Sequence, residues 1–80
     1  MIRMTKETRS APAEVLARAA AFFGAKGTGL DQTDSGPCCA SFEGGGGYVL
    51  VTVAEEGSRT LVTVEGREWE HPIQQFLGGV

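Results

Sequence analysis

The chain has 80 residues, of which 12 are glycine and 41% are hydrophobic. A chain of this length forms at most one domain, so we expect a single domain over residues 1–80, and its hydrophobic content excludes a compositionally disordered protein. No stretch reaches the roughly 18 consecutive apolar residues of a membrane span. The opening residues MIRMTKETRS lack the apolar core of a signal peptide, so we expect a cytoplasmic protein.

The net charge of −3 is distributed unevenly along the chain. Residues 1–26 carry five bases and two acids, whereas residues 27–80 carry two bases and eight acids. An acidic chain without a basic cluster matches nucleic acid poorly, so we expect no nucleic-acid partner. The uneven charge is either solvated surface or a sign that two halves of the molecule, or two copies of the chain, dock together.

Small size limits the core that this chain can build. For small scaffolds, the burial of apolar area and the entropy cost of ordering roughly cancel. Two cysteines are too few for a disulfide framework, and no cofactor or metal site is evident to add stability. Self-association, as a homodimer for example, would supply the missing burial.

The first two elements are a strand and a helix. Residues 1–8 alternate, with Ile2, Met4 and Lys6 on one side and Arg3, Thr5 and Glu7 on the other, which predicts a half-buried strand. Ser10 is placed to cap a helix over residues 11–23, Pro12 suits its first turn and Gly24 is expected to end it. Its apolar stripe contains Pro12, Leu16, Ala19, Ala20 and Phe23, with Val15 and Phe22 beside it.

Four further strands and a short helix are expected after residue 24. The strands cover residues 29–34, 38–43, 48–54 and 60–65, the last continuing towards Trp69, with turns at 34–37, at Gly44–Gly47 and at 55–58. His71 and Pro72 open a helix that Gly78 and Gly79 end, with Ile73, Phe76, Leu77 and Val80 on one side and Gln74 and Gln75 on the other.

The valines predict how two of these strands pair. Aligning Val51 with Val62, and therefore Val49 with Val64, places every valine of both strands on one face. The other face then carries Tyr48, Leu50 and Leu61, which we expect to form an association surface. The predicted fold is a two-layer α+β domain of order β-α-β-β-β-β-α, with a curved antiparallel sheet of strand order 1-5-4-3-2 and both helices on the valine face.

Two segments resemble a known superfamily. The ending LVTVEGREWEHPIQQFL and the early helix APAEVLARAAAFFG resemble the last strand with its helix, and the first helix, of START-type helix-grip domains in the polyketide cyclase/dehydrase-like (SRPBCC) superfamily. This resemblance implies an apolar ligand cavity between helices and sheet, although such domains are usually longer. The topology also resembles half of a TATA-binding-protein-like domain, which binds DNA through its sheet face. The acidic strands of this chain argue against such a use.

The glycine run is better interpreted as a turn than as a phosphate loop. Phosphate-binding loops usually precede a helix and carry a nearby Lys, Ser or Thr. Gly44–Gly47 precedes a strand and has no such residue after it, so we expect a hairpin turn or a bend in the sheet.

Cys38, Cys39 and His71 are the candidates for chemistry. Adjacent strand residues point to opposite faces and a disulfide between neighbours is rare, so we expect two free thiols, one buried and one exposed. A Cys39–His71 dyad would need the two groups roughly 3–4 Å apart. The structural alternative places His71 at the junction of strand and helix and makes both cysteines packing or surface residues.

Trp69 and the apolar side chains between helices and sheet are the candidates for ligand binding. The alternation places Trp69 on the face of Leu61, unless a bulge at Gly66 turns it into the core. The expected ligand-lining residues are Leu16, Phe23, Val51, Val62, Trp69 and Phe76.

These observations lead to three hypotheses about function. The first is a non-catalytic interaction module that associates with itself through its sheet. The second is a carrier of an apolar small molecule or lipid, as the helix-grip resemblance implies. An enzyme of Cys/His or Glu/His type is the least supported, because no catalytic motif is present.

Overall fold

The computed structural model describes all residues 1–80 of the chain. It contains five strands and two helices in the predicted order. They are β1 (Ile2–Thr8), α1 (Pro12–Phe23), β2 (Asp31–Ser35), β3 (Cys39–Gly44), β4 (Gly47–Glu56), β5 (Arg59–Arg67) and α2 (Glu70–Gly79). Neither helix combines the length and hydropathy that a membrane-spanning helix needs.

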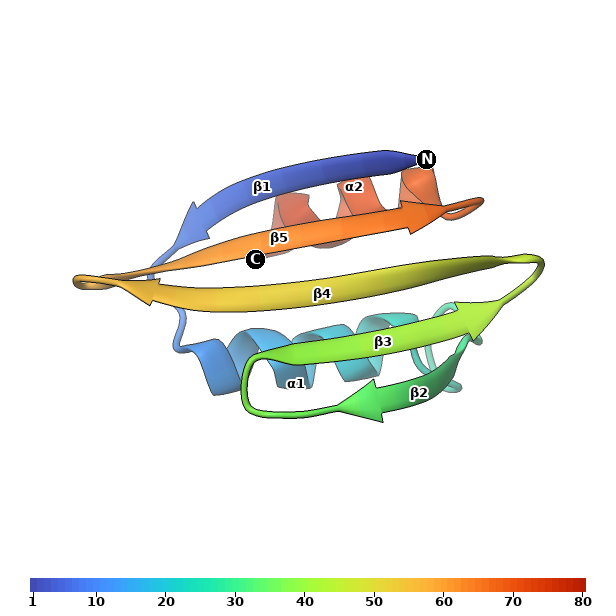
Figure 1. The fold of residues 1–80 in the computed structure, drawn as a ribbon, viewed down its shortest axis with the longest axis horizontal. Helices are drawn as coiled ribbons and strands as arrows, with labels where there is room; N and C mark the ends of the chain where they lie inside the picture. Colours follow the sequence, from blue (N-terminus) through green and yellow to red (C-terminus); the bar gives the residue numbers. More distant parts are fainter.

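The strands form one antiparallel sheet with the order β1-β5-β4-β3-β2, which confirms the predicted α+β topology. Figure 1 shows both helices behind the sheet, with α2 behind β1 and β5 and α1 behind β3, and α1 also contacts β4. Strands β1 and β2 are the two edges of the sheet. The chain therefore builds two layers, and the second face of the sheet has no helix over it.

The predicted pairing of β4 with β5 is wrong by two residues. Val51 lies opposite Val64 and Val53 opposite Val62, because Gly57 and Ser58 alone form the turn and Glu56 pairs with Arg59. Gly57 has φ 64, as the first central residue of a type II′ hairpin turn requires. A shift of two residues leaves every side chain on its predicted face, so the prediction of which residues form the valine face is still correct.

Two local predictions at the ends of elements are also wrong. Ser10 does not cap α1: the N-cap is Ala11, without a side-chain hydrogen bond, and the Ser10 carbonyl accepts a hydrogen bond from Thr60 Oγ1 at 2.7 Å. The expected turn at 34–37 lies one to two residues later, because Asp34 and Ser35 pair with β3 as part of β2.

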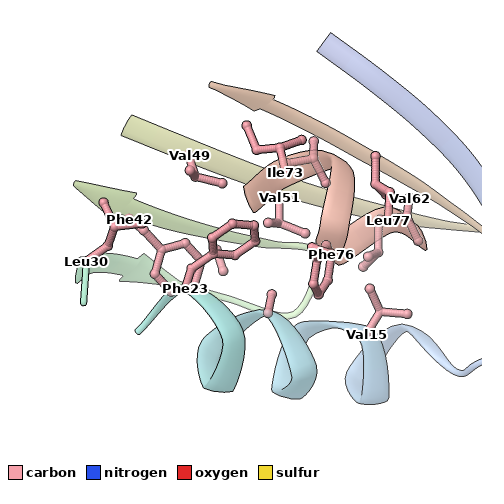
Figure 2. Packing of buried hydrophobic residues seen from close by; sticks show 14 residues of the cluster. Val15, Phe23, Leu30, Phe42, Val49, Val51, Val62, Ile73, Phe76 and Leu77 are labelled. Carbon is pink, nitrogen blue, oxygen red and sulfur yellow. The ribbon is translucent and has the colours of Figure 1, made fainter. Parts of the chain in front are cut away.

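The core lies between the valine face and the two helices. Its 14 buried residues include five valines of β4 and β5 together with side chains of both helices, and Figure 2 shows Phe23 and Phe76 meeting below these strands. The ring centroids of Phe23 and Phe76 are 5.2 Å apart, and those of Phe23 and Phe42 are 5.6 Å apart. On α1 the buried stripe is Val15, Ala19 and Phe23, so Val15 lies at its centre and Leu16 is only half-buried.

Candidate functional site

The uncovered face of the sheet carries mixed rows of side chains. From one end to the other, the rows across β3, β4 and β5 are Glu43-Tyr48-Arg67, Ser41-Leu50-Glu65, Cys39-Thr52-Thr63 and, on β4 and β5, Ala54-Leu61. Strand β1 adds Arg3, Thr5 and Glu7 beside Glu65, Thr63 and Leu61. Each apolar side chain on this face therefore has a polar or charged neighbour.

The three predicted interface residues lie on this open face but do not form one patch. Tyr48 and Leu50 are neighbours along β4, whereas Leu61 is separated from Leu50 by the row of Thr52 and Thr63. All three predicted residues are half-buried by their neighbours. The face is thus accessible, but its apolar area is divided.

The two edges of the sheet differ in regularity and in charge. Strand β2 has five exposed residues, a register shift between Gln32 and Asp34, and the carboxylates of Asp31 and Asp34. Strand β1 has seven residues in unbroken register with β5, and no proline or bulge interrupts it. A bulge and charges of one sign oppose pairing at a sheet edge, so β2 is protected, whereas β1 carries charges of both signs and offers a regular row of backbone groups. Sequence reasoning missed this difference, because an edge is defined only once the strand order is known.

The predicted ligand-lining residues form the packed core. Phe23, Val51, Val62 and Phe76 are buried, and Leu16 and Trp69 are half-buried against the same cluster. None of the three hollows of the surface lies between the valine face and the helices. A ligand in the predicted position would require this core to open, and a ligand role for these residues stays a prediction.

The apolar hollow instead lies between the two helices. It has a volume of about 490 Å³ and is open to solvent. Its lining consists of Arg18, Ala21, Phe22, Gln75, Phe76, Gly79 and Val80. The Arg18 guanidinium is held at this groove by Glu14, 3.2 Å away, and by the Gly79 carbonyl, 3.4 Å away. A second hollow, of about 560 Å³, is polar and lies at the glycine turn beside Asp31, Glu43 and Arg67.

Trp69 closes the glycine turn. Its indole N–H donates a hydrogen bond to the Gly44 carbonyl at 2.8 Å, and a Cβ at Gly45 would lie 2.6 Å from the indole ring. Gly66 pairs in regular register with both neighbouring strands, so no bulge turns Trp69. The change of direction comes from Glu68, whose φ is 75. The indole is half-buried and packs against the core.

The prediction of two free thiols is wrong. Cys38 and Cys39 form a disulfide with each other, because Cys38 lies in the β2–β3 connection, outside the strand alternation that would separate the two side chains. Cys38 is exposed and Cys39 is half-buried, so neither is the buried thiol that we expected.

The Cys39–His71 dyad is not assembled. Cys39 is oxidised and begins β3, whereas His71 is exposed in the first turn of α2, near the glycine turn at the other end of β3. Five residue-to-residue steps along β3 separate these ends, on the order of 16 Å. No group of three or more His, Cys, Asp or Glu side chains is placed to hold a metal ion.

Compared with protein-family models, curated proteins and solved structures, this chain matches none of them. The surfaces described above are therefore the features of the molecule that bear on function.

Proposed function

We propose that this chain is a non-catalytic interaction module that associates with a second copy of itself through its sheet. The observation that carries the proposal is the one-sided cover of the sheet. Both helices pack on the valine face, while the other face and the regular edge β1 remain accessible. Backbone groups of an open edge bind another strand readily, and half-apolar faces add burial once two sheets meet.

The energetics of a small domain support the same proposal. Only 17 of 80 residues are buried, and the core is a single layer between sheet and helices. An 80-residue domain has little surplus of burial over the entropy cost of ordering. Pairing with a second copy would add buried area without a larger chain.

Sedimentation velocity over a range of protein concentrations tests this proposal. We expect a species of twice the 8.4 kDa of one chain, in equilibrium with the monomer. Leu50→Asp measures the contribution of the open face, with Gln74→Asp on the exposed side of α2 as the matched control. A strict monomer at the highest attainable concentration would overturn the proposal.

Carriage of an apolar small molecule is the second candidate, favoured by the groove between the helices. Phe22, Phe76 and Val80 give the groove an apolar floor, and Arg18 places a cation at its rim. An amphipathic ligand with a carboxylate matches this lining, and its acyl part would lie between α1 and α2. Titration with a medium-chain fatty acid, followed by intrinsic fluorescence, tests it. Binding that survives both Phe22→Ala and Arg18→Gln would remove the groove as the site.

A further inference from the structure

The exposed edge of β1 presents a defined set of backbone groups. In a two-residue hairpin the residues flanking the turn exchange backbone hydrogen bonds, and hydrogen-bonded pairs then alternate along the strands. Because Glu56 and Arg59 flank the β4–β5 turn, the odd-numbered residues of β5 bond to β4 and the even-numbered ones bond to β1. The even-numbered residues of β1 are their partners. The N–H and C=O groups of Arg3, Thr5 and Glu7 therefore point away from the sheet.

These outward residues favour one register for pairing with another β1. Two copies related by a two-fold axis perpendicular to the sheet pair their strands antiparallel, centred on one residue. Centring on Thr5 places Arg3 of each copy opposite Glu7 of the other. Centring on Arg3, Lys6 or Glu7 places like charges opposite each other, and centring on Met4 leaves Arg3 opposite Thr5. Only the Thr5 register pairs every outward residue and matches opposite charges twice.

We propose that two copies of this chain pair antiparallel through β1, centred on Thr5, and so join their sheets into one. This inference rests on the proposed function and names the surface that performs it. Every outward N–H and C=O of Arg3, Thr5 and Glu7 is satisfied in this arrangement, by about six backbone hydrogen bonds. The two Thr5 side chains meet at the axis, a favourable cross-strand pair.

The helix side of β1 also accommodates this pairing. Lys6 points towards the helices, and such an inward charge often protects an edge from pairing. Here its ammonium donates a hydrogen bond to the Leu77 carbonyl at 2.7 Å, near the end of α2, so the charge is already held over its own chain. Ile2 and Met4 pack partly against the core beside it and would gain cover from the second copy.

Charge reversal across the axis tests the register. Glu7→Arg and Arg3→Glu each turn two attractive contacts into two repulsive ones, so we expect dimerisation at least about tenfold weaker for each variant. The double variant restores both contacts and is expected to dimerise like the parent chain. A mixture of the two single variants is expected to form a heterodimer, because one chain carries only acids at these positions and the other only bases.

Matched controls separate this surface from general charge effects. Glu43→Arg on β3 and Lys26→Glu after α1 make the same changes in charge at exposed positions away from β1, and are expected to leave dimerisation unchanged. In Arg3→Glu the new carboxylate also faces Glu65 within its own chain, and this repulsion could unfold the variant. Circular dichroism must therefore show that it is folded. Glu7 faces Leu61 and carries no such cost.

Sedimentation velocity of each variant and of the mixture gives distinguishable outcomes. Dimers that are lost in the single variants and recovered in the double variant and the mixture establish the Thr5-centred pairing. Dimers that persist in both single variants overturn this inference while leaving association through the sheet intact. Species that grow beyond the dimer indicate pairing of β1 with β2 and also overturn it. A monomer at every concentration overturns both proposals.

Discussion

Gly66 lies where α2 packs onto the sheet. A Cβ at this position would lie 2.5 Å from the Tyr48 carbonyl oxygen and 2.7 Å from Cδ1 of Ile73. Gly66 is buried and faces the core between Ile2 and Val49. We therefore expect Gly66→Ala to lower the free energy of unfolding by about 2 kcal/mol, because α2 must move outward.

Chemical denaturation of this variant should be compared with Gly78→Ala. Nothing lies within 4 Å of a Cβ at Gly78, which is in the last turn of α2. Alanine is the better helix former there, so this control should be neutral or slightly stabilising. Equal effects of the two substitutions would contradict the close packing at Gly66.

Glu68 is the one non-glycine residue with a positive φ, at 75. A side chain in the left-handed region costs roughly 1 kcal/mol, which glycine avoids. Glu68→Gly is therefore expected to raise the free energy of unfolding by about 0.5 kcal/mol, after the greater flexibility of the unfolded chain is subtracted. Arg67→Gly, one residue earlier in the extended strand, should destabilise. Thermal denaturation measures both, and a lower melting temperature for Glu68→Gly would contradict the argument.

Among the elements, the hairpin between β3 and β4 depends on a side chain from outside it. Gly45 and Gly46 have φ values of 60 and 82, as both central residues of a type I′ turn require. Trp69 covers this turn and donates to the Gly44 carbonyl. The turn therefore links the strands β3 and β4 to the beginning of α2.

Removing the indole N–H tests this link. Trp69→Phe keeps an aromatic ring but loses the hydrogen bond, so we expect the free energy of unfolding to fall by about 1 kcal/mol. Tyr48→Phe, in β4 directly after the glycine turn, removes a hydroxyl that makes no hydrogen bond in the structure. This substitution should change the free energy of unfolding little. Urea denaturation measures both free energies of unfolding. A similar loss from both substitutions would contradict a stabilising role of the indole hydrogen bond.

The elements also show how far a sequence determines a fold. Alternating valines are sufficient to identify the buried face, and the strand order follows from pairing the first strand with the last. The register of β4 with β5 did not follow, because the valine pattern is unchanged by a shift of two and only the turn at Gly57 and Ser58 decides it. The Cys38–Cys39 disulfide was missed for a related reason: it depends on where β3 begins.

For the whole molecule, folding and association should be coupled. If the native chain dimerises and the unfolded chain does not, its melting temperature must rise with protein concentration. We expect the melting temperature to rise measurably when the protein concentration is raised roughly fiftyfold. In Glu7→Arg the dependence should be much smaller. Scanning calorimetry measures it, and a constant melting temperature for the parent chain would contradict coupled association.

The candidate site could be predicted only in part from the sequence. The alternation of residues 1–8 already places Arg3, Thr5 and Glu7 on one side, but whether that strand lies at an edge depends on all the other strands. The expected ligand cavity depended on the size of the interior. Phe23, Phe42 and Phe76 fill that interior, as the distances between their rings show.

The acidic, interrupted edge at β2 has a consequence for aggregation. A sheet with two regular edges can recruit copies without limit and grow into a fibre, the hazard that open strands bring to every β-rich protein. In this chain an incoming strand at β2 would meet Asp31, Asp34 and a broken ladder. Polymerisation would end there, and substitutions that together made β2 regular and neutral would remove the block.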